Sequence, residues 1–234
     1  IQGVALIIGG AIIAYFAIAK LGGTPVAELT PGSANPRDVT DAAGGFSKLY
    51  ALNPDKFNMI LPRGDQHIPW TALIIGLWIP NFYYWGLNQY ITQRILGSAS
   101  LREGQKGIVF AAAMKLIIPF IVVVPGIIAF NLFSKDLAAA QERTNLRTIQ
   151  KELGSTASVT VFKTSEDWRL ANPEMAAQIA VHNAKVEAAG HAVKETVIQG
   201  GYKFDASLNL LIKKILPPGS GLVGFVLAAL LGAI

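Results

Sequence analysis

Apolar blocks alternate with polar stretches along the chain, and the length of each block limits what it can form. Four blocks carry almost no charge: residues 1–19, 68–93, 107–134 and 219–234. As helices the first three would reach roughly 28, 39 and 42 Å, against about 30 Å for the hydrocarbon core of a bilayer. The fourth would reach about 24 Å on the same rise per residue. We therefore expect four transmembrane helices, the last of them truncated, in a fragment of a longer multi-pass protein.

Composition and charge narrow the class of protein. The 234 residues are 52% hydrophobic and 15% charged, whereas soluble domains carry about 25% charged residues. The net charge is +5, but the basic residues lie in loops that are also acidic and show no interleaving with aromatic residues. That pattern does not favour a nucleic-acid partner. The absence of cysteine excludes disulfides and thiolate metal sites.

Three polar connections set the expected topology: residues 20–67, 94–106 and 135–218. The short one holds three Lys or Arg residues against one Glu, so the positive-inside rule places it in the cytoplasm and both long loops outside. In the last loop, residues 137–154 and 172–190 have helical patterns, the second with Asn172 as a cap and Pro173 at the first helical position. Residues 157–162 could form a short strand. We expect a helical cap over the outer mouth.

The candidate binding site begins at "PNFYYWGLNQYITQR", residues 80–94. Pro80 lies about 18 Å along a helix from residue 68, so it should interrupt the second span near mid-membrane. Asn81, Tyr84, Trp85 and Asn88 follow i, i+3, i+4, i+7 spacing and would share one helical face. Amides together with aromatic faces suit a sugar, whose hydroxyls donate and accept and whose ring packs on an aromatic surface. The alternative is that the amides simply join neighbouring helices.

Lys115 is the one charge in the third block, about 12 Å into the span and among apolar neighbours. Its ammonium could reach back to the cytoplasmic interface along its long stem. Alternatively, it could enter the same cavity as Asn81 and donate to a hydroxyl or carboxylate. Glycines in the first span (Gly3, Gly9 and Gly10) should let other helices approach closely.

The runs "NFYYWGLNQYITQR" and "SLREGQKGIVFAAAMKLIIPF" strongly resemble the sodium/solute symporter family, in particular its galactose/glucose-type sodium/sugar branch. The resemblance implies an all-α membrane protein with a LeuT-type inverted-repeat fold and a discontinuous helix at residues 68–93. It also implies that Asn81 contacts the sugar, that Tyr84 stacks on the sugar ring and forms the inner gate, and that Lys115 reaches a sugar hydroxyl. Trp85 and Asn88 belong to the same motif.

By the same resemblance, the expected function is sodium-coupled symport of a sugar by alternating access in a lipid bilayer, with the sodium ligands outside this fragment. The alternative is a sodium symporter of the same family for a polyol, carboxylate or amino acid, and a membrane sensor ranks below both. An enzyme is not expected, because the four apolar blocks contain no Asp, Glu or His. We expect a multi-pass protein of a bacterial inner (plasma) membrane.

Overall fold

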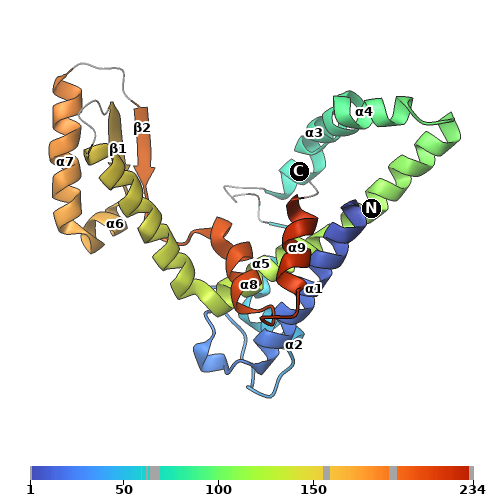
Figure 1. The fold of residues 1–234 in the computed structure, drawn as a ribbon, viewed down its shortest axis with the longest axis horizontal. Helices are drawn as coiled ribbons and strands as arrows, with labels where there is room; N and C mark the ends of the chain where they lie inside the picture. The colour runs from blue at the N-terminus through green and yellow to red at the C-terminus, as the bar shows by residue number, and fades with distance from the viewer. Residues whose placement is uncertain are drawn as a thin grey trace. The chain divides into compact units, whose positions relative to one another are not determined.

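The computed structural model describes residues 2–58, 60–61, 63, 69–154, 159–189 and 194–231. It divides into two compact units, each considered by itself below. The first unit comprises Ile1–Asn131 and Leu211–Ile234, and the second comprises Leu132–Leu210. Helices predominate in both units (Figure 1).

Helices occupy much of the predicted apolar blocks in the first unit, and a further helix forms at residues 45–52, inside the expected loop of residues 20–67. α1 and α5 are long and apolar enough to cross a bilayer. The helices are α1 (Gln2–Gly23), α2 (Gly45–Leu52), α3 (Trp78–Phe82), α4 (Gln89–Leu96), the first part of α5 (Leu101–Leu153) and α9 (Leu222–Leu231), while α8 (Ser207–Lys214) spans the boundary between the units. Short 3₁₀ turns lie at Val26–Glu28 and Pro54–Phe57 in this unit and at Phe204–Ala206 in the second unit.

Two of the three glycines of α1 are sites of close approach, as predicted. A Cβ at Gly9 would lie 3.7 Å from Val226 Cγ2 and 3.8 Å from Ala229 Cβ, both on α9. A Cβ at Gly10 would collide with Cγ2 of Ile121 on α5. At Gly3 a Cβ would meet no described atom, so the prediction was wrong there.

The C-terminal end of α1 is held by a buried lysine from α2. Lys48 is fully buried, and its Nζ donates to the carbonyls of Gly22 at 2.8 Å and Thr24 at 2.7 Å. The last carbonyls of a helix lack intrahelical partners and carry partial negative charge, so a lysine there supplies both donors and a favourable charge. α2 is thereby fixed against α1.

The second span is interrupted, but not where the sequence predicted. π-helical turns at Ala72–Gly76 and Tyr83–Leu87 flank α3, and the backbone becomes extended at Asn88, where ψ is 117°. Pro80 lies inside α3, and the bond from Asn81 N to Leu77 O, 3.2 Å, crosses it. Pro80 directly follows a π-helical turn, which is closed by the bond from Leu77 N to Ala72 O at 3.0 Å, and helical backbone continues through the proline. The expected break at Pro80 is therefore wrong.

α5 extends beyond the predicted third span at both ends. It begins at Leu101, inside the expected loop, because Ser100 starts the helix: its Oγ accepts from the Glu103 N–H at 3.3 Å. At the other end the predicted span and the predicted helix of residues 137–154 are joined. Phe133, with φ −131° and ψ 28°, is the non-helical residue between them.

The second unit is a small α/β structure, whereas we expected a helical cap with at most one short strand. β1 (Thr160–Thr164) runs parallel to β2 (Lys194–Ile198), with Thr160 opposite Lys194 and Thr164 opposite Ile198. Between them come α6 (Glu166–Ala171) and α7 (Pro173–Ala188), which lies alongside the strands (Figure 1). Its core consists of Ile149, Phe162, Trp168, Ile179 and Ile198.

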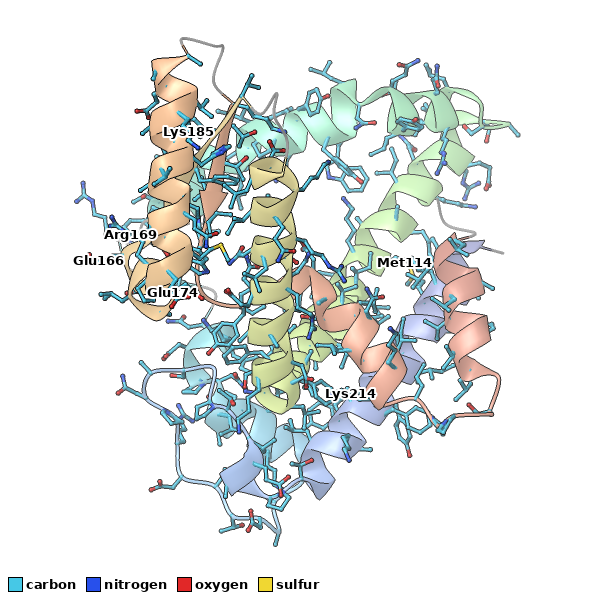
Figure 2. The ribbon with its side chains drawn as sticks, turned by 60° about the vertical axis from the view of Figure 1, so that its left-hand side comes forward. Met114, Glu166, Arg169, Glu174, Lys185 and Lys214 are labelled. Atoms are coloured by element: carbon cyan, nitrogen blue, oxygen red, sulfur yellow. The ribbon has the colours of Figure 1, made fainter. Side chains whose placement is uncertain are left out.

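In the second unit, a large aromatic side chain is buried while charged side chains near it are exposed. Trp168 on α6 is buried, and its Nε1 donates to Glu142 Oε2 at 3.0 Å. Charged side chains on the same corner (Glu166, Arg169 and Glu174) are exposed (Figure 2). The predicted strand at residues 157–162 overlaps β1, whereas β2 was not predicted.

Side chains of α7 protect the outer edge of β1. The Asn183 amide accepts from the Phe162 N–H at 2.9 Å and donates to the Phe162 carbonyl at 2.8 Å. A ring nitrogen of His182 lies 3.0 Å from the Thr160 carbonyl. An edge strand otherwise presents a row of unpaired groups, so α7 takes the place of a third strand.

Candidate functional site

The structure brings together three of the five predicted binding residues, Tyr84, Trp85 and Lys115. Tyr84 and Trp85 are neighbours on the π-helical turn Tyr83–Leu87, and Lys115 comes from α5 in the same unit. The Lys115 Nζ lies 3.6 Å from the centre of the Tyr84 ring and 4.8 Å from that of Trp85. The two rings meet edge to face, 5.4 Å apart at 86°. These three side chains are called the aromatic–lysine cluster below.

The cluster accounts for a lysine in an apolar helix. Within the described part of the chain, Lys115 forms neither a hydrogen bond nor an ion pair. A lysine deep in a membrane-spanning helix costs at least about 2.5–3.5 kcal/mol. Lys115 and Tyr84 are both exposed among the described residues, and a cation over an aromatic face at an exposed site recovers about 0.5–1 kcal/mol. Of the two alternatives for Lys115, the geometry favours the one in which its ammonium approaches the residues of the second span.

The π-helical turn determines which of the predicted residues meet. The i, i+3, i+4, i+7 spacing assumes a regular α-helix, but here Asn88 N donates to Tyr83 O at 2.9 Å, five residues back. The wider turn changes the register after Tyr83. The Tyr84 and Trp85 rings both lie against the Lys115 ammonium, whereas Asn88 makes the capping contacts described next.

Asn88 caps the helix that follows the break. Its Oδ1 accepts from the Tyr90 N–H at 3.0 Å, and its backbone carbonyl accepts from Thr92 Oγ1 at 3.0 Å. Such capping stabilises a helix start by about 1 kcal/mol. The capping bond uses Asn88 Oδ1 and leaves Nδ2 able to donate to another group.

Asn81 is exposed on α3, one turn before the cluster. Its backbone N–H is used in the helix, while its side chain makes no hydrogen bond to the described residues. The amide is thus available, but the structure does not join it to Lys115. No group of three or more His, Asp or Glu side chains that could hold a metal ion occurs among the described residues.

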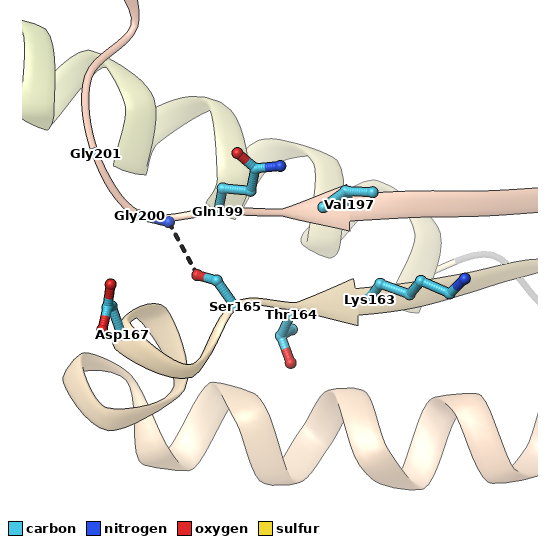
Figure 3. Close-up of a pocket in the computed structure, with 8 residues that line it drawn as sticks. All are labelled: Lys163, Thr164, Ser165, Asp167, Val197, Gln199, Gly200 and Gly201. Carbon is cyan, nitrogen blue, oxygen red and sulfur yellow. Dashed lines mark hydrogen bonds between the residues drawn. The ribbon is translucent and has the colours of Figure 1, made fainter. Parts of the chain in front are cut away.

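A second hollow, which sequence reasoning missed, lies in the second unit at the carboxyl ends of the two parallel strands (Figure 3). It encloses about 460 Å³ and is lined by Lys163, Thr164, Ser165, Asp167, Val197, Gln199, Gly200 and Gly201. The Gly200 N–H donates to Ser165 Oγ at 3.4 Å across it. Gly201 has a φ of +106°, which favours glycine. The Gly-Gly pair after the β-branched run "TVI" was the available signal.

Three relatives described as cotransporters or symporters each match 55–60% of the chain. A sodium/glucose cotransporter of Vibrio parahaemolyticus is 42% identical over 133 residues, which are 55% of this chain and 22% of that protein. The uncharacterized symporter YidK of Escherichia coli K12 is 34% identical over 140 residues, 60% of this chain and 21% of the relative. A bovine sodium/myo-inositol cotransporter 2 is 28% identical over 140 residues, with 60% and 20% covered.

The matched region is thus about a fifth of each relative's length. No solved structure matches. The sequence model of the sodium:solute symporter family matches residues 1–163. This is more than half of the 234 residues, and the chain therefore belongs to the sodium:solute symporter family.

Proposed function

We propose that the protein containing this chain couples the entry of a sugar to the entry of sodium by alternating access. The observation that carries this proposal is the aromatic–lysine cluster, in which a donor from α5 meets two ring faces beside the break in the second span. A ring face binds the apolar side of a sugar, and an ammonium donates to its hydroxyls. Membership of a sodium:solute symporter family supports the coupling to sodium.

Each predicted residue has a distinct part in this proposal. Tyr84 forms the floor of the site and, through its phenol, part of the inner gate. Lys115 donates to a solute hydroxyl. Asn81 and Asn88 supply amides, Asn88 through the Nδ2 that its capping bond leaves over. Trp85 orients Tyr84 by edge-to-face packing.

The fold and topology proposed with this function are those of a LeuT-type transporter. Irregular backbone at membrane depth is tolerated where it lines a cavity, and discontinuous helices commonly form transporter binding sites. The break at Asn88 between two short helices supports this arrangement. We place residues 94–106 in the cytoplasm, residues 20–67 and 135–218 outside, and the protein in a bacterial plasma membrane, with the sodium ligands elsewhere in the protein.

A polyol is the second candidate solute, because several relatives are described as sodium/myo-inositol cotransporters. A cyclic polyol offers the same hydroxyls and the same ring surface, so the cluster would serve it equally well. A carboxylate or an amino acid would instead use the positive charge of Lys115.

Uptake into proteoliposomes containing the full-length transporter tests the proposal. Labelled glucose, galactose and myo-inositol are offered with an inward sodium gradient and, in parallel, with potassium in place of sodium. We expect sodium to stimulate uptake of a hexose, and uptake of myo-inositol alone would favour the polyol. If sodium stimulated uptake of none of these solutes, the proposal would be wrong.

A further inference from the structure

The ammonium of Lys115 occupies the ring face on which a solute would stack. Its Nζ is 3.6 Å from the Tyr84 centroid and 4.8 Å from the Trp85 centroid, both within the range of about 6 Å for cation–π attraction. Because the rings stand at 86° with their centroids 5.4 Å apart, they form two walls of one corner. The corner has the geometry of an aromatic site for an organic cation.

Neutral ring faces, rather than a carboxylate, hold this cation. Lys115 forms no ion pair with the described residues, and residues 107–134 contain no Asp or Glu. The attraction therefore depends on charge and shape and not on a specific acidic partner. Any primary ammonium of similar size would be attracted to the corner if Lys115 left it.

We propose that Tyr84 and Trp85 form a cation site that Lys115 fills whenever no solute is bound. A nitrogen 3.6 Å from the Tyr84 centroid is at van der Waals contact, so a solute ring and the ammonium cannot share that face. Lys115 is then a tethered competitor that the solute must displace. The site for the solute rests on the proposed function, whereas the cation site does not depend on it.

Lys115 also becomes a determinant of specificity. A neutral solute with hydroxyls displaces the ammonium and then accepts a hydrogen bond from it, so the charge keeps a partner. A purely apolar solute would leave the ammonium without one, which is unfavourable in a dry site. An organic cation meets a like charge in an occupied corner. Lys115 thus selects neutral or anionic solutes that carry acceptors and rejects cations.

Shortening the Lys115 side chain should open the corner formed by the Tyr84 and Trp85 rings to a free cation. In Lys115→Ala, n-propylammonium replaces the lost Cγ, Cδ, Cε and Nζ atoms, and 1-propanol is its neutral counterpart with the same number of heavy atoms. Calorimetric titration of the purified full-length transporter should show n-propylammonium binding at least about tenfold more tightly to K115A than to the parent. Adding Tyr84→Leu to K115A should reverse this gain, and 1-propanol should show no comparable gain.

Lys115→Arg is the matched control, because it keeps the charge and should still exclude n-propylammonium. Equal binding of n-propylammonium and 1-propanol to K115A, or tight cation binding to K115R, would overturn the inference. If K115A is poorly recovered, Lys115→Ser can replace it, with ethylammonium and ethanol as the matched pair, because the serine Oγ fills the position of the lysine Cγ. Binding of labelled hexose and myo-inositol to the parent is measured in parallel: absence of both would refute the proposed function while leaving the cation result standing.

Discussion

The side chains of Asn53 and Asn131 exchange two hydrogen bonds although 78 residues separate them. Asn53 Nδ2 donates to Asn131 Oδ1 at 2.9 Å, and Asn131 Nδ2 donates back to Asn53 Oδ1 at 3.2 Å. Each amide also donates to a backbone carbonyl, Leu49 at 2.8 Å and Thr30 at 2.7 Å. Both side chains are 0% exposed. The pair joins the segment between the first two spans to α5.

Replacing Asn131 by Leu should destabilise the protein markedly. The substitution removes both hydrogen bonds that the buried Asn53 amide makes to Asn131, and a buried polar group left unsatisfied costs about 1–3 kcal/mol. Thermal unfolding of the purified protein in detergent should show a clearly lower midpoint. Asn58→Leu is the control, since Asn58 is exposed and a surface substitution changes stability by about 0.5 kcal/mol or less. Equal midpoints for the two variants would contradict this role of the amide pair.

Gly10→Ala should weaken the packing of α1 on α5. A Cβ at this position collides with Ile121 Cγ2, and overpacking typically costs about 1–3 kcal/mol. Ile121→Ala in the same protein removes the colliding atom and should restore part of the loss. Gly3→Ala, where the added Cβ meets open space, should leave the unfolding temperature unchanged or raise it. A loss in Gly3→Ala as large as in Gly10→Ala would refute the packing argument.

The two long apolar helices α1 and α5 could be predicted because apolar block length is a local property of the sequence, whereas α2 and α8 lie in stretches that we expected to be loops. The break in the second span could not be placed correctly, because its position depends on which backbone carbonyl accepts a hydrogen bond from each backbone N–H. The bond from Leu77 N to Ala72 O spans five residues, and this wider turn puts Pro80 at the start of α3. A pattern of residue types does not reveal such a shift in hydrogen bonding.

β2 was not predicted from the sequence, for a different reason. The segment "KETVI" is short and half polar, and only its pairing with β1, 34 residues away in sequence for Thr160 and Lys194, makes it a strand. Strand formation depends strongly on such non-local partners. The contact between Lys115 and Tyr84 is also non-local, yet one part of it was predictable: a lysine in an apolar helix requires a partner.

Asn183→Ala should loosen β1 selectively. The amide satisfies both the N–H and the carbonyl of Phe162, and their loss should cost about 1–3 kcal/mol. Hydrogen exchange at the Phe162 amide should accelerate, and the uncovered edge should favour aggregation. Gln178→Ala, at an exposed position of the same helix, should leave exchange at Phe162 unchanged. Unaltered exchange in Asn183→Ala would show that the edge is protected by something else.

The proposed topology can be tested with two matched cysteines. Ala177 on α7 and Ala99 in the short connection before α5 are both exposed. With a membrane-impermeant maleimide on intact cells, Ala177→Cys should be labelled and Ala99→Cys spared, because the excess of Lys and Arg places the short connection inside. Permeabilised cells should label both. The opposite pattern on intact cells would reverse the assigned orientation.

Substitutions at Tyr84 and Asn81 should damage solute binding in a fixed order. Tyr84→Ala removes the ring that faces Lys115. Loss of a fully buried aromatic costs about 3 kcal/mol, roughly a hundredfold in affinity. Tyr84 is 38% exposed, so this figure is the upper limit for Tyr84→Ala. Asn81→Ala removes one hydrogen bond to a neutral group, about 0.5–1.5 kcal/mol, or up to roughly tenfold. Tyr84→Phe keeps the ring and loses only the phenol, so binding should largely survive.

Equilibrium binding of labelled sugar to the purified variants measures this order, with Tyr90→Ala as the control. Tyr90 follows the same break but is 78% exposed, so its ring should be dispensable if the solute rests on Tyr84. A loss at Tyr90 equal to that at Tyr84 would mean that both substitutions act through the stability of the broken helix. If Tyr84→Ala bound sugar as tightly as the parent, Tyr84 would serve only as the ring that stabilises Lys115, and the solute would have to rest elsewhere.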